Sequence, residues 1–308
     1  MVTLVIMTVT VLVPDDEGVA ALSENPLVQA VRYQWGDPVP PEASKAEVLI
    51  PGRHPADNAL WRELPNLKLV QLLSAGADDW VGKVPDGVLL STCRGAHGGS
   101  MAEWVAAVLL SMYRQLDVFA TAQRMARWEP MTSETLQGQH VLIVGAGDLG
   151  RQLRRRLESF DVRCTMVGMS ARDGVHGVED LPALLPLHDV VVMMVPLTSH
   201  TRGMVDARFL ASMRDGAVLV NAARGPVVVT DALVAEVTAG RLRAALDVTE
   251  PEPLPAEHPL WTAPGVVLTP HVGGAVHGVR RRSYAVAAAE IARYAGGELP
   301  DNLVHGEY

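Results

Sequence analysis

The sequence is poor in cysteine and in net positive charge, and each scarcity excludes a class of protein. Only two cysteines, Cys93 and Cys164, occur among 308 residues, too few for a disulfide framework or a cysteine metal cluster. We therefore expect no metal site and a reducing, cytoplasmic location. The formal net charge is -9, whereas nucleic-acid binding requires a concentrated basic face, so nucleic acid is excluded as a partner.

Long apolar runs are also missing. The apolar opening, residues 1–13, lacks a basic start and is too short to cross a membrane, so we expect no membrane association. We interpret residues 8–13 as a first buried strand and residues 1–6 as an extension before it. Aromatic residues make up 5% of the chain against 48% hydrophobic residues, so the core must be aliphatic, which suits buried parallel strands.

Short apolar runs alternate with helical stretches along the whole chain, which is typical of parallel sheets covered by helices. A first sheet is predicted from the runs 9–14, 47–51, 68–73 and 88–92. A second sheet is predicted from the runs 140–144, 163–167, 189–195, 217–221, 243–248 and 266–269. Helical patterns cover residues 101–123, between the two sheets, and residues 276–295 near the end of the chain.

A glycine-rich turn follows the run 140–144 and opens a helical stretch. In such a turn the first glycine permits a tight bend, the second lets the backbone approach a pyrophosphate, and the third lets the helix pack on the strand. The helix N-terminus offers an anion site. A turn without a ligand is the alternative, but we expect a dinucleotide to bind at Gly145, Ala146, Gly147, Asp148, Leu149, Gly150 and Arg151.

Together these patterns predict an α/β protein with two doubly wound parallel-sheet domains. Residues 97–276 are predicted to form a dinucleotide-binding Rossmann domain. Residues 1–96 and 277–308 are predicted to form a smaller, flavodoxin-like, substrate-binding domain, because the last helix can return the chain to the first sheet.

Polar residues follow three predicted strands of the second sheet. They lie in the segments 221–225, 247–253 and 269–274. Because parallel strands bind ligands at their carboxyl ends, all three segments are expected to face one crevice. Arg224 offers a two-pronged contact for a carboxylate, His271 can exchange protons near neutral pH, and an acid beside His271 would stabilise its protonated form. Taken singly, the alternatives are a surface ion pair for Arg224, a loop acid for Glu252 and a core histidine for His271.

Several motifs in this order resemble the D-isomer-specific 2-hydroxyacid dehydrogenase family over essentially the whole chain. They are residues 145–150, 195–198, 221–225, 247–253, 258–261 and 269–274. The resemblance implies an oxidoreductase that transfers a hydride between NAD(P)H and a small 2-keto acid or D-2-hydroxy acid. Residues 94–103 look most like the branch that reduces glyoxylate and hydroxypyruvate.

The resemblance also implies a catalytic triad. Arg224 binds the substrate carboxylate and polarises the keto oxygen, His271 donates the proton during reduction, and Glu252 stabilises the protonated form of His271. Arg224 and His271 thus count as substrate-binding residues too.

Further binding residues are implied in both domains. Asp247 holds the nicotinamide carboxamide, and Pro196 contacts the cofactor. In the first domain, the segment Ser74, Ala75 and Gly76 resembles the substrate loop, whose backbone N–H groups hold the carboxylate.

Cofactor choice is predicted from the end of the second strand of the second sheet. An acid that accepts hydrogen bonds from the adenosine ribose is expected there, but residue 168 is glycine. Ser170 and Arg172 follow and offer a hydroxyl and a guanidinium, which suit a 2′-phosphate. We therefore predict NADP in preference to NAD, with pairing of Arg172 to Asp173 as the alternative.

One further departure from the family pattern and one partner remain to be considered. Val229 and Thr230 stand where relatives usually have Asp-Glu, so Thr230 or the next residue is expected to cap the following helix. Trp128 falls in a segment that lies near the partner subunit in relatives, which implies a homodimer, although a core tryptophan is an equally good interpretation.

Other functions stay open on the same fold, namely a nucleotide-sensing corepressor and a formate- or phosphite-type dehydrogenase. The intact set of Arg224, Glu252 and His271 argues against a corepressor. The particular keto acid is not predicted, because discrimination of one methylene is worth only about 1–3 kcal/mol and depends on pocket shape.

Overall fold

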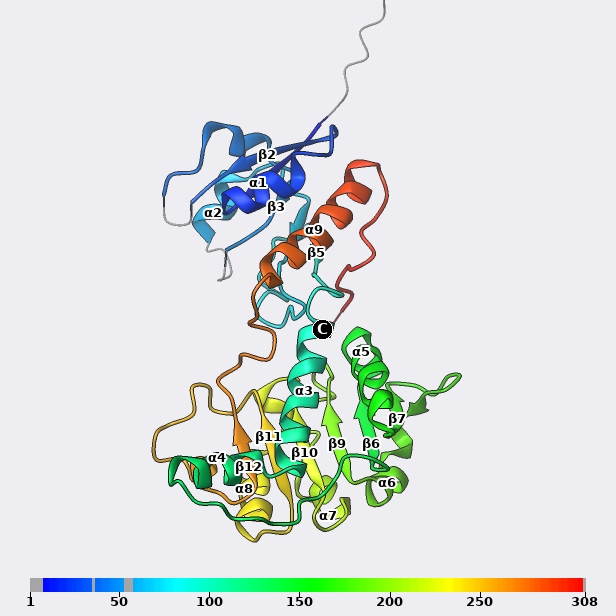
Figure 1. The fold of residues 1–308 in the computed structure, drawn as a ribbon. Helices are drawn as coiled ribbons and strands as arrows, with labels where there is room; N and C mark the ends of the chain where they lie inside the picture. Colours follow the sequence, from blue (N-terminus) through cyan, green and yellow to red (C-terminus); the bar gives the residue numbers. More distant parts are fainter. Residues whose placement is uncertain (1–7, 35–36, 53–57, 307–308) are drawn as a thin grey trace, which may run out of the picture. The chain divides into compact units, whose positions relative to one another are not determined.

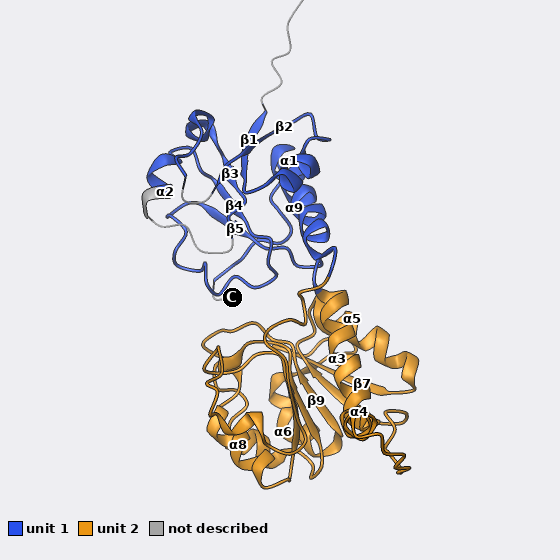
Figure 2. Ribbon diagram, turned by 60° about the vertical axis from the view of Figure 1, so that its left-hand side comes forward, with its two compact units in different colours: residues 1–97, 277–308 blue, residues 98–276 orange. Residues whose placement is uncertain are grey.

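The computed structural model describes residues 8–34, 37–52 and 58–306, and the chain forms two compact units (Figure 1 and Figure 2). Unit 1 comprises residues 1–97 and 277–308, and unit 2 comprises residues 98–276. The expected extension at residues 1–6 lies outside the described residues. Each unit contains a parallel sheet with helices, which confirms the predicted fold class.

Unit 1 contains a five-stranded parallel sheet in the order β2-β1-β3-β4-β5. The strands are β1 Val9–Val13, β2 Val28–Arg32, β3 Val48–Leu49, β4 Leu69–Gln71 and β5 Leu89–Ser91. The helices are α1 Asp16–Leu22, the 3-10 helix η1 Pro41–Lys45, α2 Asn58–Glu63 and α9 Val279–Ala295. The sequence pattern misses β2, because this edge strand is only partly buried and includes Gln29 and Arg32.

Helices α1 and α9 cover one face of this sheet. Leu22 of α1 and Tyr284 of α9 pack in one buried cluster with Val11 and Val13 of β1. Leu12, between those two valines, packs in a different cluster on the opposite face. The last helix therefore completes the unit that the first third of the chain begins (Figure 2).

The chain segment after α9 pairs with β5, which is an edge strand of this sheet. Leu303 forms an antiparallel bridge with Ser91, and the N–H of Val304 donates to the carbonyl oxygen of Leu90 at 2.8 Å. The side chain of Asn302 in the same segment is buried. Backbone groups at this edge of unit 1 thus have partners from the end of the chain.

Unit 2 contains a seven-stranded parallel sheet in the order β12-β11-β10-β9-β6-β7-β8. The strands are β6 His140–Val144, β7 Arg163–Gly168, β8 His176–Gly177, β9 Val190–Met193, β10 Val218–Asn221, β11 Arg243–Leu246 and β12 Val266–Leu268. Read from β8, this is the dinucleotide-binding order 3-2-1-4-5-6 with one further strand, and its switch point lies between β6 and β9. The sequence pattern misses the two-residue β8, which is too short to produce an apolar run.

Helices cover both faces of this sheet (Figure 1). Helices α3 and α5 pack on one face against Ile143 and Val192, while α6, α7 and α8 pack on the other against Leu142 and Val191. The helices are α3 Gly98–Tyr113, α4 Leu116–Arg124, α5 Asp148–Leu157, α6 Leu181–Leu184, α7 Ala207–Ser212 and α8 Thr230–Thr238. The 3-10 helices are η2 Glu158–Phe160, η3 Val178–Asp180, η4 Leu185–Leu187, η5 Gly225–Val227 and η6 Pro259–Trp261.

Two helix predictions are wrong in their bounds. The helix expected over 101–123 is broken into α3 and α4, because Gln115 adopts a left-handed φ of 51° between them. The last helix begins at Val279 and not at residue 276, because Gly278 before it has a φ of 76°. Within the described ranges no single helix is long and apolar enough to cross a membrane; α3 and α4, bent by 66°, meet the length and composition together.

Candidate active site

The glycine-rich turn joins β6 to α5 and is open above its second glycine. Gly145 has a φ of 123°, and a Cβ there would collide with the carbonyl oxygen of Met194. A Cβ on Gly150 would collide with the carbonyl oxygen of Gly145, so helix and strand approach too closely for a side chain. In the described structure, nothing beyond its chain neighbours lies within 4 Å of a Cβ built on Gly147. The turn has the shape that a pyrophosphate requires at the start of α5.

Two arginines converge on this turn. Arg151 Nη1 and Arg172 Nη2 donate to the carbonyl oxygen of Ala146 at 3.1 Å and 3.3 Å. A Cβ on Gly168 would lie 2.8 Å from Arg172 Nη1, so the guanidinium occupies the space beside this glycine. Arg172 Nη1 also lies 3.4 Å from the carbonyl oxygen of Ser170. The guanidinium of Arg172 thus lies beside Gly168, the position where an acid that binds the adenosine ribose is usual.

Asp148 and Leu149 turn their side chains toward the protein. A Cβ on Gly98, the first residue of α3, would collide with Asp148 Oδ2, and this buried oxygen has no hydrogen-bond partner in the described part of the chain. Leu149 packs against the core cluster beneath α3 and α5. The first N–H groups of α5 have no helical acceptor, so the backbone of these residues is what faces an anion.

The loop after β9 is held by a threonine that the sequence analysis missed. Thr201 is buried, and its Oγ1 donates to the carbonyl oxygen of Pro196 at 2.6 Å and accepts from the N–H of Thr198 at 2.8 Å. The sequence does show two threonines shortly after Pro196, Thr198 and Thr201, which could have indicated a side-chain hydrogen bond in this loop. Pro196 therefore lies on a braced loop next to the switch point of the sheet.

Asp247 follows β11 and organises the loop that carries His271. Its side chain is buried, with Oδ1 accepting from Thr269 Oγ1 at 2.6 Å and from the N–H of Val272 at 2.8 Å, while Oδ2 accepts from the N–H of Gly273 at 2.9 Å. The carbonyl oxygen of Asp247 accepts from the N–H of His271 at 2.7 Å. This bracing role for Asp247 was not foreseen from the sequence.

Arg224 lies in a tight turn directly after β10. The buried Asn221 closes the turn: its Nδ2 donates to the carbonyl oxygen of Arg224 at 3.0 Å and its Oδ1 accepts from the N–H of Ala223 at 3.1 Å. A Cβ on Gly225 would collide with the carbonyl oxygen of Thr249, so this turn packs backbone to backbone on the loop that carries Glu252.

His271 and Glu252 form the predicted pair. His271 Nδ1 lies 2.7 Å from Glu252 Oε1, and the two side chains are 47% and 43% exposed. The backbone of His271 has a φ of 55°, an uncommon value that the bonds to Asp247 hold in place. Nδ1 donates to the carboxylate, which leaves Nε2 for a substrate.

Ser74, Ala75 and Gly76 belong to unit 1, in the loop after β4. Ser74 Oγ donates to the carbonyl oxygen of Gly76 at 2.7 Å, and the carbonyl oxygen of Ser74 accepts from the N–H of Cys93 at 2.8 Å. This loop borders a cavity of about 430 Å³ lined by Pro51, Gly52, Leu72, Leu73, Ser74, Trp80, His97 and Arg280. Burial, followed by the charge of Arg282, lowers the pKa of His97. The substrate role of the loop stays a prediction.

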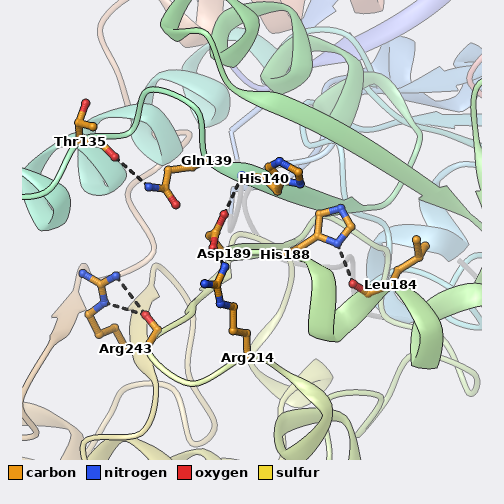
Figure 3. A network of polar contacts seen from close by, with 9 residues as sticks. Thr135, Gln139, His140, Leu184, His188, Asp189, Arg214 and Arg243 are labelled. Atoms are coloured by element: carbon orange, nitrogen blue, oxygen red, sulfur yellow. Dashed lines mark hydrogen bonds and ion pairs between the residues drawn. The ribbon is translucent and has the colours of Figure 1, made fainter.

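A second polar cluster lies at the opposite, amino ends of the unit 2 strands (Figure 3). The carboxylate of Asp189 accepts from the N–H of His140 at 2.9 Å and pairs with Arg214. A cavity of about 400 Å³ borders this cluster. Because ligands of parallel sheets bind at the carboxyl ends, this cluster ties strand starts together and lies apart from Arg224 and His271.

Known proteins resemble the chain over most of its length. A family model described as D-isomer specific 2-hydroxyacid dehydrogenase, NAD binding domain, matches residues 106–273. A glyoxylate reductase from Thermofilum pendens is 35% identical over 258 residues, covering 79% of this chain and 76% of that protein. A glyoxylate/hydroxypyruvate reductase A from Escherichia fergusonii is 34% identical over 268 residues, covering 80% and 85%.

Solved structures share the fold. A D-isomer specific 2-hydroxyacid dehydrogenase from Xanthobacter autotrophicus, in complex with NADPH and MES, has a TM-score of 0.84 at 32% identity, covering 97% of this chain and 98% of that one. An NADPH-dependent glyoxylate/hydroxypyruvate reductase from Sinorhizobium meliloti, in complex with NADP and sulfate, has a TM-score of 0.81 at 26% identity, covering 96% and 98%.

Proposed function

Because the chain belongs to the D-isomer specific 2-hydroxyacid dehydrogenase family, we propose that it reduces a small 2-keto acid, such as glyoxylate or hydroxypyruvate, to the D-2-hydroxy acid with NAD(P)H. The observation that carries this proposal is the 2.7 Å contact between His271 and Glu252 on the same sheet edge as Arg224. A protein that only senses nucleotides has no need of a histidine aligned by an acid.

The cofactor fits the turn between β6 and α5. The collisions that a Cβ would cause at Gly145 and Gly150 show a backbone built for close packing, and the open space above Gly147 accommodates a pyrophosphate. When bound, the nicotinamide supplies the hydride for the keto carbon.

Arg224, His271 and Glu252 are proposed to bind the substrate, donate the proton and align the proton donor, respectively. The guanidinium of Arg224 holds the substrate carboxylate and polarises the keto oxygen, because its fork matches two oxygens. His271 donates the proton from Nε2 to that oxygen as negative charge develops on it. Glu252 accepts the hydrogen bond from Nδ1, which orients the ring and stabilises its charged form.

NADPH is the proposed preferred cofactor. Arg172 fills the space beside Gly168 and reaches toward the glycine-rich turn, where a 2′-phosphate on the adenosine ribose would meet a guanidinium. Within the described residues no ion pair joins Arg172 to Asp173, so the alternative of mutual neutralisation lacks support. Ser170 adds a hydroxyl on the same exposed loop.

A homodimer is proposed through the segment that follows α3. Trp128 is 97% exposed, and Leu116, Val118, Met125 and Met131, near it in the sequence, are also exposed, so these apolar side chains lack cover within the described chain. A second copy is the occupant that the resemblance in this segment implies. The unpaired Cys93 and Cys164 are compatible with the proposed cytoplasmic location.

The activity is tested with purified protein and a panel of 2-keto acids, following the loss of reduced nicotinamide absorbance with NADPH and with NADH in separate series. Formate and phosphite are tested in parallel with the oxidised cofactors. Turnover with glyoxylate or hydroxypyruvate supports the proposal. Oxidation of formate or phosphite instead, or cofactor binding without turnover of any panel member, would contradict it.

A further inference from the structure

The loop that carries Glu252 has few hydrogen bonds to the rest of unit 2, although Val248 is buried at its start and Leu254 packs against the core at its end. Residues 248–254 lie between β11 and η6 and form neither helix nor strand. In the part of the chain that the structure describes, two hydrogen bonds reach this segment from outside. One is the bond between His271 and Glu252 at 2.7 Å, and the other runs from Thr230 Oγ1 to the carbonyl oxygen of Glu250 at 2.7 Å.

Thr230 is the first residue of α8, but it does not cap the helix. The N-cap residue is Val229, which makes no side-chain hydrogen bond, so the expectation that Thr230 or the next residue replaces the missing cap is wrong. Thr230 uses its hydroxyl proton on the neighbouring loop instead. Its position within the helix explains this outcome, because a capping side chain must precede the first helical residue.

Two contacts hold the start of the loop from either side. The carbonyl oxygen of Thr249 fills the space that a side chain on Gly225 would take, and the next carbonyl, that of Glu250, accepts from Thr230. Inside the loop, Thr249 Oγ1 donates to the carbonyl oxygen of Pro251 at 2.9 Å. Glu252 follows at once, so its backbone position depends on these contacts.

The pair needs such support because both of its side chains are partly exposed. Glu252 and His271 are each about half exposed, and exposed ion pairs gain little unless both partners are held in place. His271 is held by Asp247 through its backbone, whereas the corresponding hold on the Glu252 loop comes from Thr230.

We propose that Thr230 is a positioning residue for catalysis, whose hydroxyl tethers the carbonyl of Glu250 and thereby holds the Glu252 carboxylate against His271. This inference rests on the proposed roles of Glu252 and His271. The hydroxyl proton of Thr230 is used on the carbonyl oxygen of Glu250, so we expect its effect on catalysis to pass through Glu252.

The test compares Thr230→Val, which removes only the hydroxyl, with Thr230→Ser, which keeps it. Thr230→Val is expected to lower kcat for keto-acid reduction about three- to fivefold, the usual worth of one hydrogen bond, with the KM for NADPH unchanged. Thr230→Ser should restore kcat, and Thr238→Val, at the other end of α8, should behave like the parent protein.

A double-mutant cycle decides whether the effect passes through Glu252. On a Glu252→Gln background, Thr230→Val should cause no further loss of kcat, because the carboxylate it positions is gone. The variants leave in place the charged groups Asp247 and Arg224 on neighbouring loops and Glu250 on the same loop. Losses of kcat that multiply independently, or an unchanged kcat in Thr230→Val, would overturn the proposed role of Thr230 but not the proposed function. Full activity in Glu252→Gln would contradict the proposed function as well.

Helix stability is separated from positioning by a second variant. Val229→Asp adds the missing cap and should raise the melting temperature without changing kcat. Combined with Thr230→Val, it should restore stability but not kcat. Recovery of kcat together with the melting temperature would show that Thr230 acts through the stability of α8, which would overturn the proposal.

Discussion

The turn after β10 holds both the backbone of Arg224 and one nitrogen of its guanidinium. Nη1 donates to the carbonyl oxygen of Ala223 at 2.8 Å, and the turn itself is closed by Asn221, so the guanidinium starts from a defined position. Arg224→Lys should lower kcat/KM for the keto acid about tenfold or more, because an ammonium cannot make the two-pronged contact. Steady-state kinetics measure this, with Arg214→Lys at the opposite sheet edge as the control. Near-normal turnover in Arg224→Lys would remove Arg224 from the site.

A single residue, Arg172, is also expected to decide between NADPH and NADH. Arg172→Ala should raise the KM for NADPH about tenfold, the worth of a charge-assisted hydrogen bond, and leave the KM for NADH unchanged. Arg154→Ala, which removes the same charge from the exposed pair with Glu158, is the matched control. Equal effects on both cofactors in Arg172→Ala, or a higher kcat/KM with NADH in the parent protein, would contradict the NADPH preference.

His188 is buried shortly before strand β9 of unit 2, where a positive charge on its ring is unfavourable. His188 is 4% exposed, and its Nδ1 lies 2.7 Å from the carbonyl oxygen of Leu184 (Figure 3). Its Nε2 lies 2.9 Å from Thr165 Oγ1. The carbonyl can only accept, so Nδ1 carries the proton and Nε2 accepts from the threonine. Burial lowers the pKa of His188, and the neighbouring His140 lowers it further, against the opposing bond to Leu184.

This shift predicts a pH-dependent stability. The unfolded chain binds a proton at His188 near pH ~6.5, above the lowered pKa of the folded state, so unfolding takes up a proton. The free energy of unfolding should therefore fall as pH drops from about 6.5 to the lowered value, and stay level above about 6.5 as far as His188 is concerned. Urea unfolding at several pH values measures this. His188→Gln should be less stable but less sensitive to pH, whereas the exposed control His200→Gln should keep the parental slope; an unaltered slope in His188→Gln would contradict the assignment.

At the scale of elements, the apolar strands were predictable and the short or mixed ones were not. Fully buried runs such as Val190–Met193 and Val218–Asn221 need no partner to be recognised as strands. Strand β2 alternates with polar residues at a sheet edge, and the break at Gln115 depends on one backbone angle that local composition does not encode. Edges and breaks are set by tertiary packing, which a single sequence does not display.

The candidate site was also predictable only in part from the sequence. Motif spacing placed Glu252 and His271 together, because both segments follow neighbouring strands whose carboxyl ends meet. The bracing by Thr201, the inward turn of Asp148 and the tether from Thr230 each depend on contacts between distant segments. Side-chain direction, and not residue type, decides those contacts.

The whole molecule should assemble through the exposed apolar surface around Trp128. Trp128→Ser should convert a dimer to a monomer without unfolding it, because an exposed indole contributes nothing to the core of its own unit and most to an interface. Sedimentation velocity measures the mass, and circular dichroism checks the fold. As a control, Leu187→Ser should leave the mass unchanged, because it alters another exposed apolar residue, at the amino ends of the unit 2 strands. A parent protein that sediments as a monomer would contradict the homodimer.

The pairing of Leu303 with Ser91 at the rim of unit 1 also bears on how the protein can be handled. A chain cut short after α9 would leave β5 with uncovered N–H and C=O groups, and an uncovered strand is a template onto which other chains add. The shortened protein would then be lost to precipitation as its concentration rises, even though its nucleotide-binding unit is untouched. Shortened forms of the protein should therefore keep residues 302–304, which supply these partners.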